Sequence, residues 1–190
     1  MRRIAVTGGI AEGKSTVVGY MADAGLSTLS SDAVAREVFG LPSVQAELSA
    51  LLQQPAPVSA ENVRRAIAAH PDLRRAVNRA MHPEILGRIE SSGAIVVEVP
   101  LLFEACLQGL FPRIWVVTCG RQEQLRRLSR RLGDESIALR LIETQLPTLA
   151  KLPFADRIVR TDRPYEIVKV SVLEQIRAER GAAVASGQTA

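Results

Sequence analysis

The sequence predicts an α/β fold in which helices flank a parallel five-stranded sheet, with an inserted helical subdomain and a helical lid. Three observations predict it. Short apolar segments alternate along the chain with segments of helical periodicity. A glycine-rich turn joins the first strand to the first helix. About sixty residues separate the second strand from the third, although a crossover between parallel strands needs only about a dozen.

Length and composition indicate one globular domain. The chain has 190 residues and is 47% hydrophobic, which suits one substantial core and is too little for two full-sized domains. Cys106 and Cys119 show no paired spacing, so neither a disulfide framework nor a zinc site is indicated, and we expect a reduced, cytoplasmic setting. No apolar run approaches the roughly 18 residues of a membrane helix, so we expect a soluble protein without a membrane partner.

The charge balance suggests acidic partners. The net charge is +4, and 21 of the 24 basic residues are arginine. Arginine-rich surfaces suit phosphates, although biased codon usage would produce the same composition. Only 4% of the residues are aromatic, which is too few for the stacking platforms that bind single strands, so we expect no nucleic-acid partner.

The expected elements follow one another along the chain. A strand at Ile4–Thr7 breaks at two glycines and passes into a helix that ends near Gly25. A second strand at 26–30 leads to Asp32, a candidate N-cap for a helix over 33–39. Further strands are expected at 95–99, 114–118 and 157–160, and a last helix at 165–180.

Two helical excursions interrupt the sheet within the single domain 1–190. The first, 41–90, is expected to be a helical substrate-binding insertion, with proline-separated helices at 43–52, 59–69 and 72–90. The second, 121–145, is expected to be the lid. The polar residues 181–190 are expected to form a disordered tail. The nucleotide-binding core comprises 1–40, 91–120 and 146–180.

Residues 8–16, GGIAEGKST, contain the phosphate-binding pattern G-x-x-x-x-G-K-[ST], the P-loop, between an expected strand and an expected helix. Gly8 and Gly13 allow conformations that expose backbone N–H groups, and the helix directs its positive dipole end to the same place. Lys14 would reach the β- and γ-phosphates, Ser15 would ligate Mg²⁺, and Thr16 would lie near the α-phosphate. The alternative is a chance glycine turn, and the pattern does not distinguish ATP from GTP. The residues assigned to cofactor binding are Gly8, Gly9, Ala11, Glu12, Gly13, Lys14, Ser15 and Thr16.

Two acidic residues follow strands at the carboxyl edge of the sheet, where open α/β sheets bind their ligands. Asp32 follows the second strand, and we assign it to a substrate hydroxyl, which it would orient and deprotonate. Glu98 ends the apolar run of the third strand, and we assign it with Ser15 to Mg²⁺. The alternatives are a plain N-cap for Asp32 and a chance acid for Glu98.

Arginines gather in the expected lid. Phosphoryl transfer needs water to be excluded and charge to be offset, so one or two of them would clamp phosphates, and we assign Arg140 a catalytic role. The alternative is a solvated helix face. The other lid arginines are Arg121, Arg126, Arg127, Arg130 and Arg131. Two pairs in the insertion would meet either a substrate pyrophosphate or solvent, namely Arg64 with Arg65 and Arg74 with Arg75.

Several segments, in order from Arg3 to about Arg177, resemble the dephospho-coenzyme A kinase family. The phosphate loop continues into blocks similar to the D-A-D-x-x-A-R, H-P-x-I, V-P-L-L-F-E and Q-x-P-x-x-x-K-x-x-x-A-D segments of that family. The matching residues here are 7–16, SSDAVARE at 30–37, HPEI at 82–85, VPLLFE at 99–104, and Gln145, Lys151, Ala155 and Asp156.

The resemblance implies a P-loop kinase fold and transfer of the γ-phosphoryl group of ATP, with Mg²⁺, to the ribose 3′-hydroxyl of dephospho-coenzyme A. This reaction is the last step of coenzyme A synthesis. The resemblance makes Asp32 the catalytic carboxylate and places Arg36 and His82 in the acceptor site. It implies a wall near that site formed by Leu101, Leu102, Phe103 and Glu104.

The chain also departs from the family pattern. Ala11 and Glu12 stand where the family commonly has Gly and Ser; we expect Ala11 to cost little and the Glu12 side chain to point away from the phosphates. Ser30 replaces the first Asp of D-A-D, so Asp32 is the carboxylate that remains there. Thr161 precedes Asp162 where an Asn-containing adenine contact is common, and the insertion lacks the usual D-G-x-x-x-R run.

Two other functions stay open at this point. One is another small-molecule or nucleoside kinase of the same fold, which a panel of acceptors would distinguish. The other is a P-loop switch or assembly ATPase. The sequence contains neither the guanine-reading N-K-x-D nor the S-G-G-Q motif of such proteins, which favours the kinase.

Overall fold

A computed structural model describes residues 1–185 and divides the chain into two compact units. One unit comprises Met1–Ser30 and the chain from Ala94 onward, and the other is Ser31–Gly93. The first contains the whole sheet and the second is entirely helical.

The five strands form one parallel sheet, as predicted. The order across the sheet is β2-β3-β1-β4-β5, so β1 lies at the centre and pairs with β3 on one side and with β4 on the other. The register aligns Ser30 at the end of β2 with Glu98 at the end of β3. The strands are β1 (Ile4–Thr7), β2 (Thr28–Ser30), β3 (Val96–Glu98), β4 (Arg113–Thr118) and β5 (Arg157–Arg160).

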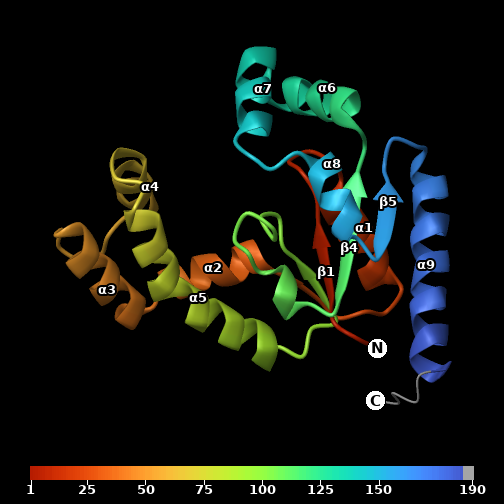
Figure 1. Cartoon of the computed structure of the whole chain (residues 1–190), viewed down its shortest axis with the longest axis horizontal. Coiled ribbons are helices and arrows are strands. Elements are labelled where there is room, and N and C mark those ends of the chain that lie inside the picture. The colour runs from red at the N-terminus through yellow and green to blue at the C-terminus, as the bar shows by residue number, and fades with distance from the viewer. Residues whose placement is uncertain (186–190) are drawn as a thin grey trace. The chain divides into compact units, whose positions relative to one another are not determined.

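Helices in the sheet unit cover the strands and make up the segment 121–145 that the sequence predicts to be a lid. The long α9 packs against β5 and α1 (Figure 1), and the core beneath contains the fully buried Trp115 of β4. The lid segment folds as two contacting helices, α6 and α7, whose own small core contains Leu128, Ala138 and Ile142. The helices of this unit are α1 (Lys14–Asp23), α6 (Arg121–Leu132), α7 (Glu135–Glu143), α8 (Thr148–Lys151) and α9 (Tyr165–Ala185), with 3₁₀ turns at Gln108–Leu110 and Leu152–Phe154.

The prediction for the end of the last helix was wrong. Helix α9 continues five residues past the expected end at 180 and includes Gly181. The residues that follow Gly181 are mostly alanine, which has the highest helix propensity, so a single glycine does not stop the helix. The expected disordered tail at 181–190 therefore begins inside α9, and 186–190 lie outside the described residues.

The helical unit consists of α2 (Ser31–Phe39), α3 (Pro42–Leu52), α4 (Ala60–Ala69) and α5 (Leu73–Ser91). Helix α5 packs against the other three. The Gln45 side chain donates to the backbone oxygen of Phe39 at 2.8 Å and accepts from the Val58 N–H at 2.7 Å, which fastens the segment between α3 and α4. Asp32 lies in the first turn of α2 and is not its N-cap, because α2 begins at Ser31, two residues earlier than expected.

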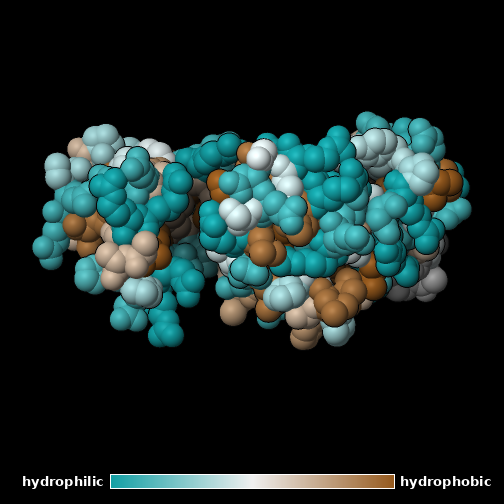
Figure 2. All heavy atoms as spheres, turned by 90° about the horizontal axis from the view of Figure 1, so that it is seen from above, coloured by the Kyte–Doolittle hydropathy of each residue, from teal (hydrophilic) through white to brown (hydrophobic). Residues whose placement is uncertain are grey.

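The surface of the described residues is largely polar. Figure 2 shows that hydrophilic residues cover most of the face it presents and that the hydrophobic ones lie in separate patches. Among residues 1–185, no helix is both long enough and apolar enough to cross a bilayer.

Candidate active site

The loop between β1 and α1 has the backbone conformation that a phosphate cradle requires. Gly8 and Gly13 have φ of 151° and 91°, which side-chain-bearing residues rarely adopt. A Cβ at Gly8 would lie 2.2 Å from the Val117 carbonyl oxygen, so only glycine fits there. Gly13 is the N-cap of α1, whose first turn carries no acidic residue. The N-terminus of α1 therefore directs the positive end of its dipole at the loop, and the nearby acidic residue is Glu12, which precedes the N-cap.

Ala11 has a left-handed backbone, with φ of 61°. An L-residue pays about 1–2 kcal/mol for this conformation, so the expectation that alanine costs little here was wrong. Ile10 and Ala11 pack against the lid core around Leu128, and the Ile10 N–H donates to Gln145 Oε1 at 2.9 Å. These contacts hold the strained conformation in place.

Lys14 and Ser15 open α1. The largely buried Lys14 donates from Nζ to the carbonyl oxygens of Gly8 at 3.3 Å and Gly9 at 2.8 Å, so its ammonium lies against the loop. The Ser15 hydroxyl donates to Glu98 Oε1 at 3.1 Å, which joins the start of α1 to the end of β3. The structure thus brings together the two residues assigned to Mg²⁺.

A hydroxyl and a carboxylate are the oxygen ligands that Mg²⁺ takes from proteins when waters and substrate phosphates complete its octahedron. Ser15 and Glu98 therefore fit a nucleotide-bound Mg²⁺. Within residues 1–185, no group of three or more His, Cys, Asp and Glu side chains is placed to hold a metal ion.

An arginine-lined cavity of about 560 Å³ adjoins the loop at Gly13 and Thr16. Arg127 is fixed at its edge, because Nη1 donates to Thr161 Oγ1 at 3.1 Å and Nη2 to the Thr161 carbonyl oxygen at 2.5 Å. A planar guanidinium held in this way can stack on an aromatic base or pair with phosphate. The cavity is lined by Gly13, Thr16, Glu123, Arg126, Arg127, Arg130, Arg131, Thr161, Arg163, Pro164, Tyr165 and Val168.

Glu123 orients two of the arginines of α6, Arg126 and Arg127. Its oxygens accept from Arg126 at 2.6 Å and from Arg127 at 2.7 Å. These hydrogen bonds lower the pKa of the Glu123 carboxyl to about 2. Glu123 therefore stays ionised at neutral pH, and both guanidinium groups keep their partner.

The two other lid arginines do not line this cavity. Arg140 is exposed on α7, where its Nη1 lies 3.4 Å from Ser136 Oγ. Arg121 lines a separate cavity of about 610 Å³ between the lid and α8, which also contains Gly9, Glu12 and Thr148. The catalytic role assigned to Arg140 stays a prediction.

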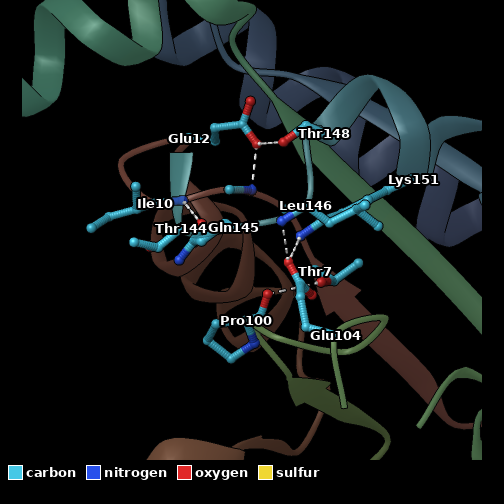
Figure 3. Close-up of polar contacts among 12 residues, drawn as sticks. Thr7, Ile10, Glu12, Pro100, Glu104, Thr144, Gln145, Leu146, Thr148 and Lys151 are labelled. Carbon is cyan, nitrogen blue, oxygen red and sulfur yellow. Dashed lines mark hydrogen bonds and ion pairs between the residues drawn. The ribbon is translucent and has the colours of Figure 1, made fainter. Parts of the chain in front are cut away.

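The expected acceptor wall, 101–104, mixes exposed and buried side chains. Leu101 is exposed, and the Phe103 ring lies 5.5 Å from that of Phe154. Leu102 is fully buried, so it would support the wall only by packing. Glu104 Oε1 accepts from the Leu146 N–H at 3.0 Å and from the buried Lys151 Nζ at 2.8 Å (Figure 3). The wall is thereby tied to the segment that follows the lid.

The helical unit carries the other predicted acceptor residues. Asp32 and Arg36 are exposed one turn apart on α2, which places both on the same face of the helix. Within residues 1–185 the Asp32 carboxylate has no hydrogen-bond or ion-pair partner, so it is available as an acceptor. His82 of α5 lines a hollow of about 410 Å³ together with Arg75, Asn78, Arg79, Pro83 and Leu86.

The arginine pairs of the insertion differ in their surroundings. Arg65 pairs with Glu61 at 2.7 Å, and Arg64 Nε donates to the Ala60 carbonyl oxygen of its own helix. Arg75 lies in the hollow beside His82, and Arg74 does not. Of these four arginines, Arg75 is the one that the structure groups with a predicted site residue.

Sequence reasoning missed the contacts of Glu12. The Glu12 carboxylate is buried and accepts from the Gly9 N–H and the Thr118 hydroxyl. It also accepts from the Thr148 hydroxyl (Figure 3). A charged residue inside a phosphate loop signalled that donors must be nearby. It did not indicate which donors, because Thr118 and Thr148 lie more than a hundred positions away along the chain.

The family model and the curated relatives that match this chain carry the same name. A family model for dephospho-CoA kinase matches residues 2–166. Proteins named dephospho-CoA kinase from Gloeobacter violaceus and Carboxydothermus hydrogenoformans are 34% and 31% identical, each match covering 90% of this chain and 89% and 90% of the relative.

Solved structures share the fold. The protein TT1252 from Thermus thermophilus superposes with a TM-score of 0.82 at 24% identity, covering 94% of this chain and 97% of that one. A dephospho-CoA kinase from Campylobacter jejuni gives 0.66 at 20% identity over 98% of both chains. A shikimate kinase from Aquifex aeolicus gives 0.54 at 16% identity over 94% of this chain and 98% of its own. These likenesses show a P-loop kinase fold.

Proposed function

The chain belongs to the dephospho-CoA kinase family, and from that premise we propose how its own residues phosphorylate dephospho-CoA with ATP. The acceptor oxygen is the ribose 3′-hydroxyl. It bonds to the γ-phosphorus while the bond from that phosphorus to the β–γ bridging oxygen breaks. The hydroxyl proton passes to Asp32 and ADP leaves. The reaction needs positioning and charge stabilisation more than covalent chemistry from the protein.

The phosphates of ATP lie in the loop at the start of α1. Its backbone N–H groups and the helix dipole favour the anion, and the Lys14 ammonium is already within the loop. The base and ribose extend past Thr16 into the cavity edged by Arg127 and Thr161. Arginines on the α6 side of this cavity would offset phosphate charge.

Ser15 and Glu98 would hold the Mg²⁺, which would supply neutralisation of phosphate charge when bound. Their 3.1 Å contact supports the assignment, because it places a hydroxyl and a carboxylate together at the first turn of α1. Glu98 would keep the Ser15 hydroxyl oriented, since a carboxylate only accepts hydrogen bonds.

The acceptor side consists of Asp32, Arg36 and His82, extended by the basic stripe of α5. Arg75, Arg79 and His82 recur at steps of four and three along α5, which places them on one face. Such a face suits the pyrophosphate of dephospho-CoA, because guanidinium groups bind phosphate oxygens in pairs. Asp32, exposed and unpaired among the described residues, acts as general base.

The observation that carries the kinase assignment is the placement of Lys14, Ser15 and Glu98 around one helix N-terminus. Two free cysteines support a reducing, cytoplasmic location.

The test is an acceptor panel with Mg²⁺ and ATP. Purified protein is incubated with dephospho-CoA, shikimate, gluconate, nucleosides and single-stranded nucleic acid, and ADP formation is measured. We expect turnover with dephospho-CoA and background rates with the others. Faster turnover of another small acceptor would identify a different kinase, and ATP hydrolysis stimulated by nucleic acid alone would identify an ATPase.

A further inference from the structure

Glu12 is a charged residue buried inside the phosphate loop. Its residue exposure is 1%, and both carboxylate oxygens accept hydrogen bonds. Oε2 accepts from the Gly9 N–H at 2.5 Å and from the Thr148 hydroxyl at 2.6 Å, and Oε1 accepts from the Thr118 hydroxyl at 3.0 Å. Figure 3 shows the side chain turned toward Thr148.

A carboxylate at this place is costly on two counts. Burial removes it from water, and within residues 1–185 no basic side chain forms an ion pair with it. It also adds negative charge to a loop that takes the phosphates of ATP. Its three hydrogen bonds offset the loss of hydration. The effect of Glu12 on the protein therefore depends on the segments that these hydrogen bonds connect.

The three donors join separate parts of the sheet unit. Gly9 belongs to the loop itself, Thr118 ends β4, and Thr148 begins α8 after the lid. The Glu12 main chain is held as well, because its carbonyl oxygen accepts from the Thr161 hydroxyl at 2.7 Å. One residue thereby connects the loop to β4, α8 and the segment after β5.

The same region is tied to the lid by neighbouring contacts. The Ile10 N–H donates to Gln145 Oε1 at 2.9 Å, and Gln124 Nε2 donates to the Ile10 carbonyl oxygen at 3.0 Å. Gln124 lies on α6 and Gln145 lies just after α7. Both ends of the predicted lid therefore form hydrogen bonds with Ile10, the residue before the strained Ala11.

The space around Gly9 is filled by the same side chains and by Gln124. A Cβ at Gly9 would lie 2.4 Å from Gln124 Nε2 and 3.0 Å from both Glu12 Oε2 and Thr148 Oγ1. No side chain larger than hydrogen fits without moving these groups. The backbone of Gly9 is held on both sides of its Cα. Its N–H donates to the Glu12 carboxylate, and its carbonyl oxygen accepts from Lys14 Nζ.

We propose that Glu12 is a positioning residue that keeps the phosphate loop in its ATP-binding conformation by fastening Gly9 to Thr118 and Thr148. Its carboxylate acts through Gly9 and the left-handed Ala11 and does not itself contact the substrate. Because Thr148 opens the helix that follows the lid, the fastening also links the loop to the base of the lid. The proposal rests on the proposed binding of ATP by this loop.

Three variants test it. Glu12→Ala removes all three bonds, Glu12→Gln keeps an oxygen for Gly9 and Thr148 without the charge, and Thr148→Val removes one donor at constant shape. The matched control is Thr144→Val, because Thr144 is exposed at the end of the lid and its hydroxyl donates only to the Leu141 carbonyl oxygen of its own helix. For each variant, the Kd of ATP, both KM values, kcat and Tm without nucleotide are measured.

We expect the variants to weaken the binding of ATP and to leave the KM of dephospho-CoA nearly unchanged. Glu12→Ala should raise the Kd and KM of ATP by about 10–100-fold, since buried donors lose their acceptor, with the KM of dephospho-CoA within about twofold. Thr148→Val should raise them by about 3–10-fold, and Glu12→Gln should restore ATP affinity to within about fivefold of wild type. The double variant Glu12→Ala/Thr148→Val should bind ATP as Glu12→Ala does, because both changes break one link.

Equal ATP affinity in Glu12→Ala, Thr148→Val and Thr144→Val, with only Tm reduced, would overturn the proposal and leave Glu12 a stability residue. If Glu12→Ala does not fold, Thr148→Val and Glu12→Gln still test the proposal. An unchanged Kd of ATP in Thr148→Val, together with a large loss of ATP affinity in Glu12→Gln, would contradict the role of the Glu12–Thr148 hydrogen bond. A wild-type protein that binds no ATP would instead refute the proposed function, which separates the two failures.

Discussion

Removing the Glu104 carboxylate is expected to destabilise the protein more than removing its partner, Lys151. The Lys151 side chain is 0% exposed and that of Glu104 is 21% exposed. Glu104 Oε1 accepts from Lys151 Nζ at 2.8 Å and from the Leu146 N–H at 3.0 Å. Glu104→Leu therefore leaves an ammonium group in the interior without a carboxylate. Lys151→Met leaves a carboxylate that still reaches water and the Leu146 N–H.

The magnitude follows from this difference in burial. Losing one partner of a buried ion pair costs about 3–5 kcal/mol, because the remaining charge is uncompensated. In a chain of 190 residues, each kcal/mol corresponds to about 2–4 °C in Tm, so Glu104→Leu should lower Tm by roughly 6–20 °C. Lys151→Met removes the buried charge and keeps an unbranched apolar chain, so we expect a loss of about 1 kcal/mol or less.

Thermal and urea unfolding of the two single variants and of Glu104→Leu/Lys151→Met measure this. The double variant should be more stable than Glu104→Leu, because the second change removes the unpaired ammonium. Equal losses in the two single variants, or a double variant less stable than Glu104→Leu, would refute the reasoning.

Three further predictions concern the site and the thiols. Asp32→Asn should lower kcat about 10²–10⁴-fold with little change in the KM of ATP, because a general base is lost while binding is kept; near-normal kcat would remove the assignment. Arg79→Gln should raise the KM of dephospho-CoA by about fivefold, and Arg74→Gln, whose residue is on the same helix but outside the hollow, by less than about twofold; equal effects would mean that the hollow does not bind the acceptor. Burial raises the pKa of the Cys119 thiol from 9.0 to about 11, so at pH 8 a thiol reagent should titrate the exposed Cys106 in the native protein and Cys119 only after unfolding. Since the folded state holds that proton more tightly, the associated stability is present below pH 9.0 and is lost as pH rises through about 11; rapid native reaction of both thiols would contradict this.

Local pattern predicted the parts of the fold that depend on nearby residues. The strand, glycine loop and helix from Ile4 to Asp23 follow from apolar spacing and two glycines, and the parallel sheet follows from the alternation of strands and helices. Element ends were less predictable. Asp32 has the chemistry of an N-cap but lies inside the first turn of α2, and Gly181 lies inside α9, because the flanking residues continue each helix.

The network around Glu12 could not be predicted, since it depends on distant residues. Thr118 and Thr148 become donors only because β4 lies beside β1 and α8 returns over the loop. The same holds for Lys151, whose burial against Glu104 no local pattern reveals. The cost of Ala11 was also hidden, because a left-handed backbone at alanine is set by contacts with the lid core.

The measurement that tests the central claim most directly is phosphoryl transfer from ATP to dephospho-CoA with the product position identified by phosphorus NMR, in wild type and Lys14→Ala. We predict one new phosphate at the ribose 3′ position, formed with Mg²⁺ present, and a rate reduced about 10²–10³-fold or more in Lys14→Ala. A wild-type protein that leaves dephospho-CoA unchanged, or a Lys14→Ala variant as active as wild type, would contradict the account.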